Sequence, residues 1–218
     1  MATELLEARV PGLHPVTDRP GGPTGHGPTG DGGDDGGTGA GFDPARFGLW
    51  AFLGTVTMLF FGFTSAYIVR RTGMDWRALP APRLLWWNTV ALLLSSATLE
   101  AARRRRSALD LAGLRRWLGA TALLAAFFVA GQFQAWRLLS ARGFFLASNP
   151  HSSFFYLLSG VHLVHLAGGL VWFTLVLLRL RGARYAAPAG ARALSLLATY
   201  WHFLGLLWVY VVILIFGF

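Results

Sequence analysis

The sequence contains no cysteine, and all nineteen of its basic residues are arginine. Without cysteine, the chain can form neither a disulfide framework nor a thiolate metal site. Hydrophobic residues make up 54% of the 218 positions and are concentrated in long blocks, as is typical of a membrane protein. Because the arginines lie at the ends of these blocks, we interpret them as helix anchors and exclude nucleic-acid binding.

Acidic residues are absent from the middle of the apolar blocks. Glu100 lies beside the Arg103 to Arg106 cluster, and Asp75 and Asp110 lie between blocks. Pumps and ion carriers normally place ionisable side chains along the transport path, and the sequence also lacks the inverted repeat of many secondary transporters. The pattern therefore disfavours a transporter.

The first 47 residues differ from the rest in composition. Residues 21–41 read GGPTGHGPTGDGGDDGGTGAG and contain almost nothing to bury. We predict that residues 1–47 form a disordered Gly/Pro/Asp-rich cytoplasmic tail, and that residues 48–218 form the membrane domain.

Five apolar segments follow, each near or above the ~20 residues that cross a bilayer as a helix. They run from Gly48 to Val69, Leu84 to Ala102, Trp117 to Trp136, Ser152 to Leu178, and Leu194 to Phe218. Lipid cannot satisfy free backbone polar groups, and the alternating pattern of a barrel is missing. We therefore predict an all-α integral membrane protein, a bundle of five transmembrane helices behind a disordered N-terminal tail.

The arginines also predict an orientation. Eleven arginines lie on the side of the membrane that holds the connections after the second and fourth helices, and six lie on the opposite side. By the positive-inside rule, the amino terminus faces the cytoplasm and the carboxyl terminus faces outward.

Two predicted helices carry a seam of small and weakly polar residues at three-and-four spacing. Such seams allow helices to approach closely. The first seam is Gly48, Ala51, Thr55, Met58, Gly62 and Ser65, and the second is Asn88, Ala91, Ser95 and Thr98.

Three histidines lie in or near the predicted spans. His162 and His165 are three residues apart on the fourth span, and His202 opens the last apolar run. His165 and His202 could supply the two axial ligands of a b-type haem. The alternative, which we favour because His-x-x-His without a carboxylate is a weak metal signal, is that the rings hydrogen-bond between helices. Gln132 has the same structural interpretation.

Three separated stretches resemble subunit III of the haem-copper oxidases. LLWWNTVALLLSSATLEAA, with Asn88 and Thr89, is similar to one family motif. SSFFYLLSGVHLVHLAGG, with Ser159, Gly160, His162 and His165, resembles a second, and YWHFLGLLWVYV, with Tyr200, Trp201, His202 and Trp208, a third. The resemblance runs from about Phe47 to the end of the chain, in the family's order and spacing.

The resemblance implies a short five-helix form of a cytochrome c oxidase subunit III in a bacterial cell membrane. It implies partnership with subunit I, which holds haems and copper, with subunit II, which receives electrons, and with phospholipids. This subunit binds no cofactor or metal and has no catalytic residue of its own; it stabilises subunit I and supports proton uptake during aerobic respiration. On this basis we interpret the eleven motif residues, Gln132 included, as structural.

The sequence departs from the family at three embedded acids. Val56, Ala135 and Gly205 stand where many members carry a carboxylate. The departure favours packing and lipid holding over a proton role. Two alternatives remain open: a subunit III-like component of a quinol oxidase or nitric oxide reductase, and a small haem b membrane protein.

Overall fold

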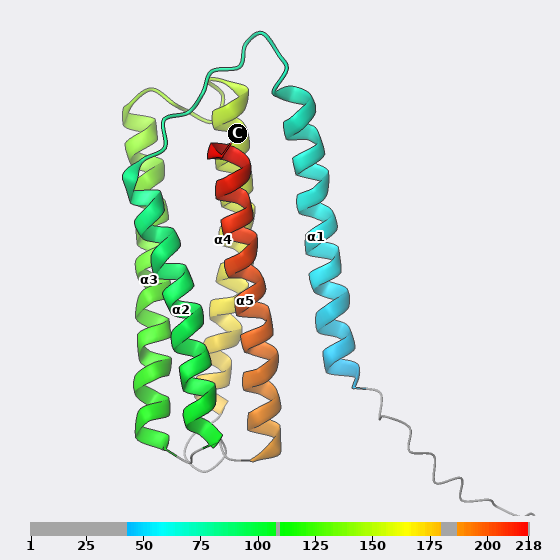
Figure 1. Cartoon of the computed structure of the whole chain (residues 1–218), viewed down its shortest axis with the longest axis vertical. Coiled ribbons are helices and arrows are strands. Elements are labelled where there is room, and N and C mark those ends of the chain that lie inside the picture. The colour runs from blue at the N-terminus through cyan, green and yellow to red at the C-terminus, as the bar shows by residue number, and fades with distance from the viewer. Residues whose placement is uncertain (1–42, 108–109, 180–186, 218) are drawn as a thin grey trace, which may run out of the picture. The chain divides into compact units, whose positions relative to one another are not determined.

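The computed structural model describes residues 43–107, 110–179 and 187–217, and these residues form five α-helices (Figure 1). The helices are α1 (Pro44–Arg70), α2 (Arg83–Ser107), α3 (Leu111–Ala141), α4 (Pro150–Arg179) and α5 (Pro188–Phe216). No strand occurs in these ranges, so the predicted all-α class is confirmed. Most of the predicted tail lies outside the described residues, but residues 44–47 form the first turn of α1 and extend the first predicted span.

Local sequence explains where α1 and α3 begin. The Asp43 carboxylate accepts hydrogen bonds from the backbone N–H groups of Ala45 and Arg46, both at 3.1 Å. Asp110 caps α3 in the same way, through Gly113 N at 2.8 Å. Side-chain oxygens at this position satisfy amides that have no partner within the helix.

Four of the helices, α1, α3, α4 and α5, are long and apolar enough to cross a membrane. The remaining helix, α2, has 25 residues but carries polar side chains such as Asn88, Ser95 and Thr98. Those side chains, together with Arg83, Glu100 and the Arg103 to Arg106 cluster, lower the hydropathy of α2 below that of the others. Asn88, Ser95 and Thr98 face neighbouring helices, because the first two are fully buried and Thr98 hydrogen-bonds to Thr121 of α3 at 2.9 Å.

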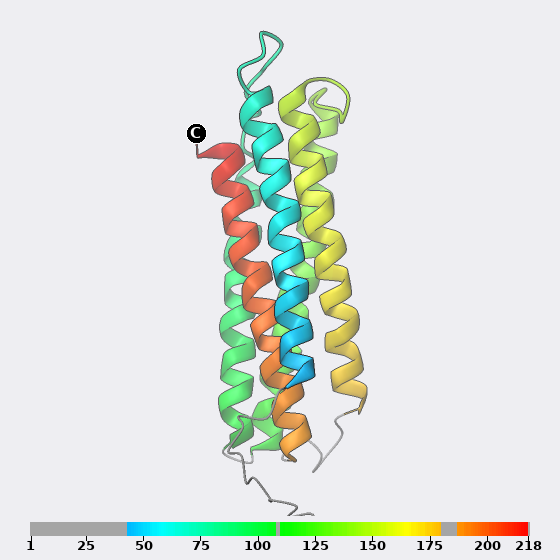
Figure 2. The ribbon, with the colours of Figure 1, turned by 90° about the vertical axis from the view of Figure 1, so that its right-hand side faces the viewer.

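The most extensive packing is between α2 and α3, while α5 packs against α1, α2 and α4. The helix α1 packs mainly against α4 and α5, and Figure 2 shows it running between those two helices. The largest fully buried side chains, Trp201 and Trp208, both belong to α5. They make α5 the centre of the described bundle.

The two predicted seams differ in the structure. Asn88, Ala91 and Ser95 of α2 are buried. By contrast, every member of the α1 seam is exposed, and a side chain added at Gly48 or Gly62 would meet nothing within 4 Å.

Candidate functional site

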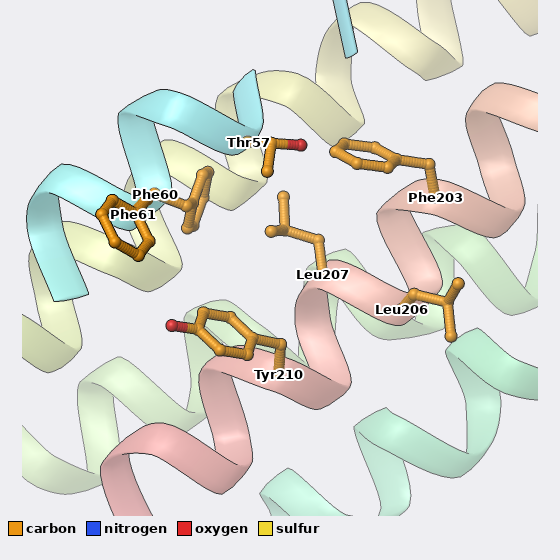
Figure 3. Close-up of a pocket in the computed structure, with 7 residues that line it drawn as sticks. All are labelled: Thr57, Phe60, Phe61, Phe203, Leu206, Leu207 and Tyr210. Carbon is orange, nitrogen blue, oxygen red and sulfur yellow. The ribbon is translucent and has the colours of Figure 1, made fainter. Parts of the chain in front are cut away.

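A groove lies between α1 and α5 and is lined almost entirely by apolar side chains (Figure 3). Its volume is about 380 Å³. Phe60 and Leu207 at its base are buried, whereas Phe61 and Leu206 at its edges are each 70% exposed. The remaining lining residues are Thr57, Phe203 and Tyr210. The groove therefore opens to the surface that lipid or a partner would cover, and its shape and chemistry suit a hydrocarbon chain.

Two polar contacts join α1 to α5 on either side of this groove. The hydroxyls of Thr64 and Tyr210 are hydrogen-bonded at 2.6 Å. Toward the start of both helices, Arg192 donates to the Asp43 carboxylate. These contacts hold together two helices that share few other polar interactions.

Several residues of the family motifs hold pairs of helices together. The indole N–H of Trp208 donates to Thr89 Oγ1, and that of Trp201 donates to Ser95 Oγ, both at 3.0 Å. Both hydrogen bonds join α5 to α2.

A second set of motif contacts involves α4. The Tyr200 hydroxyl donates to the carbonyl of His165 at 2.8 Å, which joins α5 to α4. Trp136 of α3 donates to Ser159 Oγ of α4 at 3.0 Å. Gly160 of α4 is half-buried, with open space where a side chain would start.

The three histidines of the motifs lie in different surroundings. His162 is fully buried and contacts the rings of Phe128 and Trp208. His165 is half-buried, with its Nδ1 hydrogen-bonded to the carbonyl of Val161 at 2.8 Å. His202 is half-buried, and no hydrogen bond or ring contact joins it to the described part of the chain. If His202 links two helices, as predicted, the second helix must therefore belong to another subunit.

His151, which no sequence motif singles out, joins three parts of the chain at the first turn of α4. Its Nδ1 accepts from the backbone N–H of Leu79 at 2.9 Å, and its Nε2 lies 3.1 Å from the carbonyl of Ile215. The accepting Nδ1 requires Nε2 to carry the proton and to donate. The ring also stacks on Trp76 at 4.7 Å. No motif contains His151. Its position just after Asn149 and Pro150 was the one available signal, because polar side chains are common at the start of a helix.

The three positions at which the family often carries acids are all buried. Val56 is 2% exposed and Ala135 is fully buried. A side chain added at Gly205 would start 3.2 Å from Ser96 Oγ of α2. Each of these positions is thus occupied by a small, non-ionisable residue packed inside the protein.

Among the described residues, Glu100 lies near the end of α2, paired with Arg103, and the other acids lie outside the helices. Asp75, between α1 and α2, accepts from Arg70 at 2.8 Å, and this hydrogen bond lowers the pKa of the Asp75 carboxyl. Asp110 follows α2 and caps α3, and the hydrogen bond from Gly113 N lowers the pKa of the Asp110 carboxyl. Both carboxylates therefore stay ionised at neutral pH outside the helices.

Known proteins match this chain over most of its length. Residues 40–218 match the family model of cytochrome c oxidase subunit III. The chain is 33% identical over 167 residues to a probable cytochrome c oxidase subunit 3 of Nocardia farcinica, an alignment that covers 74% of this chain and 82% of that protein. It is 30% identical over 179 residues to the cytochrome c oxidase subunit 3 of Synechocystis, covering 80% and 76%. With the Bacillus subtilis protein of the same name it shares 31% identity over 175 residues, covering 75% and 81%.

The match extends over all five helices and includes the three motifs whose residues hold α2, α4 and α5 together. The chain therefore belongs to the cytochrome c oxidase subunit III family and is a multi-pass membrane protein.

Proposed function

We propose that this chain is the non-catalytic subunit III of a haem-copper terminal oxidase, which passes electrons from cytochrome c to dioxygen. In this role it docks to subunit I, which holds the haems and copper, and forms a complex that also contains subunit II. The observation that carries the proposal is that residues of the family motifs form hydrogen bonds between helices. Trp208 with Thr89 and Trp201 with Ser95 join the bundle internally, and neither pair leaves a side chain free for chemistry.

The complex is the direct test. The native complex, isolated through an affinity tag on this chain, is expected to contain haem and copper and to consume oxygen with reduced cytochrome c. A complex with neither haem nor copper would overturn the proposal. Oxygen uptake with quinol but not with cytochrome c would refute the electron donor alone.

The second part of the proposal is that the chain protects subunit I by holding phospholipid. The groove between α1 and α5 supports this because its base is buried, its edges are exposed and its lining is apolar. An acyl chain seated there would fill space between two helices that are otherwise joined by few polar contacts. Its removal is expected to loosen α1 and to speed the loss of oxidase activity during turnover.

Two threonines of α1 provide a matched test. Thr57 lines the groove, whereas Thr55 lies outside it; both are exposed, and both donate to a backbone carbonyl four residues earlier. Thr57→Phe should fill the groove and lower the number of phospholipids that native mass spectrometry finds bound to the complex. Thr55→Phe should leave that number unchanged. Equal lipid content in the two variants would refute the groove as the site.

The third part is the orientation, with the amino terminus in the cytoplasm of a bacterial cell. Arg103, Arg116 and Arg192 are among the arginines at the end of the bundle where α2 ends and α3 and α5 begin, and this excess supports the assignment. Because the chain has no cysteine, single substitutions give a clean readout. Ala147→Cys should react with an impermeant maleimide added to intact spheroplasts, and Ala187→Cys should react only after lysis. The opposite pattern would reverse the orientation.

A further inference from the structure

Three polar side chains in the interior have no hydrogen-bond partner among the described residues. They are Asn88 of α2, Gln132 of α3 and His162 of α4, and each is fully buried. In all three, both the nitrogen and oxygen atoms of the amide, or both ring nitrogens, are without a partner. Ser96 Oγ is also without a partner, but it lies two turns along α2 and faces Gly205.

Asn88 of α2 packs against α3 at Gly131, the residue that precedes Gln132. The Asn88 amide lies directly against Gly131, so that a methyl group added there would fall 2.0 Å from Asn88 Oδ1. Gln132 is the next residue of α3. Because Gly131 has no side chain, the Asn88 amide can pack against α3 there, at the same height along the helix axis as Gln132.

His162 belongs to the same level of the bundle. Its ring lies 5.9 Å from that of Phe128, which precedes Gln132 by one turn of α3. Trp208 of α5 lies 5.1 Å from His162 and 5.0 Å from Phe128, and it donates to Thr89, the neighbour of Asn88. Phe128 and Trp208 therefore link the three polar side chains into one layer.

We propose that Asn88, Gln132 and His162 together bind ordered water inside the bundle. A buried polar group without a partner costs about 1–3 kcal/mol, so three in one layer would be strongly destabilising unless something satisfied them. Each amide offers donors and an acceptor, and a neutral imidazole offers one of each, which matches the two donors and two acceptors of water. Neither an acid nor an arginine belongs to this layer, so a neutral ligand fits it better than an ion.

Bound water would hold the α2–α3 pair in a defined position relative to α4. The contact between α3 and α4 is much less extensive than that between α2 and α3. The hydrogen bonds that join α3 to α4 lie on one side of the polar layer, where Trp136 donates to Ser159 and Tyr156 bonds to Ser140 and to the carbonyl of Trp136. Water shared by Gln132 and His162 would add hydrogen bonds across this weak interface. Water binding in this layer is independent of the electron donor and of what occupies the groove between α1 and α5.

Solid-state NMR of the full chain in bilayers tests the proposal through magnetisation transfer from water protons. We expect water cross-peaks at the imidazole N–H of His162 and at the side-chain NH₂ groups of Asn88 and Gln132. His151 is the internal control, because both of its ring nitrogens are hydrogen-bonded to the backbone and should show no such peak. In Gln132→Met, a side chain of similar length, the water peak at His162 should fall at least several-fold.

Two results would overturn the proposal. One is the absence of a water peak at His162 in the unmodified chain. The other is a set of transfers among the three side chains alone, which would mean that they satisfy one another directly. The spectrum of the unmodified chain decides the question even where Gln132→Met fails to fold.

Discussion

The close packing of Asn88 of α2 against Gly131 of α3 gives a quantitative test of the interface between these helices. In Gly131→Ala the new methyl group would lie 2.0 Å from Oδ1 and 2.8 Å from Cγ of Asn88. The Asn88 side chain is fully buried and cannot turn out to solvent. Forcing extra atoms into a well-packed interior costs about 1–3 kcal/mol, while alanine in a helix interior gains up to about 1 kcal/mol over glycine.

Gly160 of α4 provides the control. It too lies inside a helix, but a side chain added there would meet nothing within 4 Å. Both substitutions gain the same helix propensity, so the difference between them isolates the clash. We expect Gly131→Ala to lower the free energy of unfolding by about 1–3 kcal/mol relative to Gly160→Ala.

Denaturant unfolding of the full chain in mixed micelles, followed by tryptophan fluorescence, measures this difference. A double-mutant cycle sharpens it: with Asn88→Ala in place, the space beside Gly131 opens, and Gly131→Ala should then cost little. Equal stability of the two glycine variants, or the same cost with and without Asn88→Ala, would refute the predicted contact.

Three further experiments test contacts between residues that are far apart in the sequence or lie in different subunits. Tyr210→Phe should lose about 0.6 kcal/mol, the average value for such a hydrogen bond in a membrane protein, and the same change should cost nothing further once Thr64→Val is in place; an equal loss in both backgrounds would contradict the shared hydrogen bond. His151→Phe keeps an aromatic ring but removes both hydrogen bonds, so backbone hydrogen exchange at Leu79 should quicken several-fold, and unchanged exchange would count against the link. His202→Leu should weaken association with subunit I and speed inactivation during turnover; immediate loss of a metal spectrum with assembly intact would contradict a structural role.

The fold could be predicted from the sequence because it depends on the lengths of the apolar blocks. Each of the first four predicted spans lies on one helix, and the fifth lies on α5 up to Phe216, although α3 begins six residues before Trp117 and α5 begins six before Leu194. The early starts have local causes: Asp110 caps one helix, and Pro188 occupies the first turn of the other. Hydropathy alone does not detect such starts, because these turns extend beyond the apolar run.

The contacts of single residues were harder to predict. The spacing of Asn88 and Ser95 correctly indicated a packed face of α2. The same kind of pattern on α1 lies on an exposed face. A seam of small residues therefore shows that another helix could pack closely there, but not that a helix of this chain does so. His151 was missed because its partners are 72 and 64 positions away and both are backbone groups, which leave no mark in the side-chain pattern.

The residues at the three positions where the resemblance leads us to expect an acid bear on proton movement through the chain. Val56 lies on α1 midway between Phe52 and Phe60, whose rings are each 6.2 Å from that of His165. A carboxylate at position 56 would therefore be directed toward an imidazole, whereas valine makes this surface apolar. At Gly205 the adjacent group is the hydroxyl of Ser96, which cannot titrate in the physiological range. Because α1, α3, α4 and α5 contain no acidic residue, these helices cannot form a relay of carboxylates, and we expect them to contribute mechanically, by holding lipid and a neighbouring subunit in place.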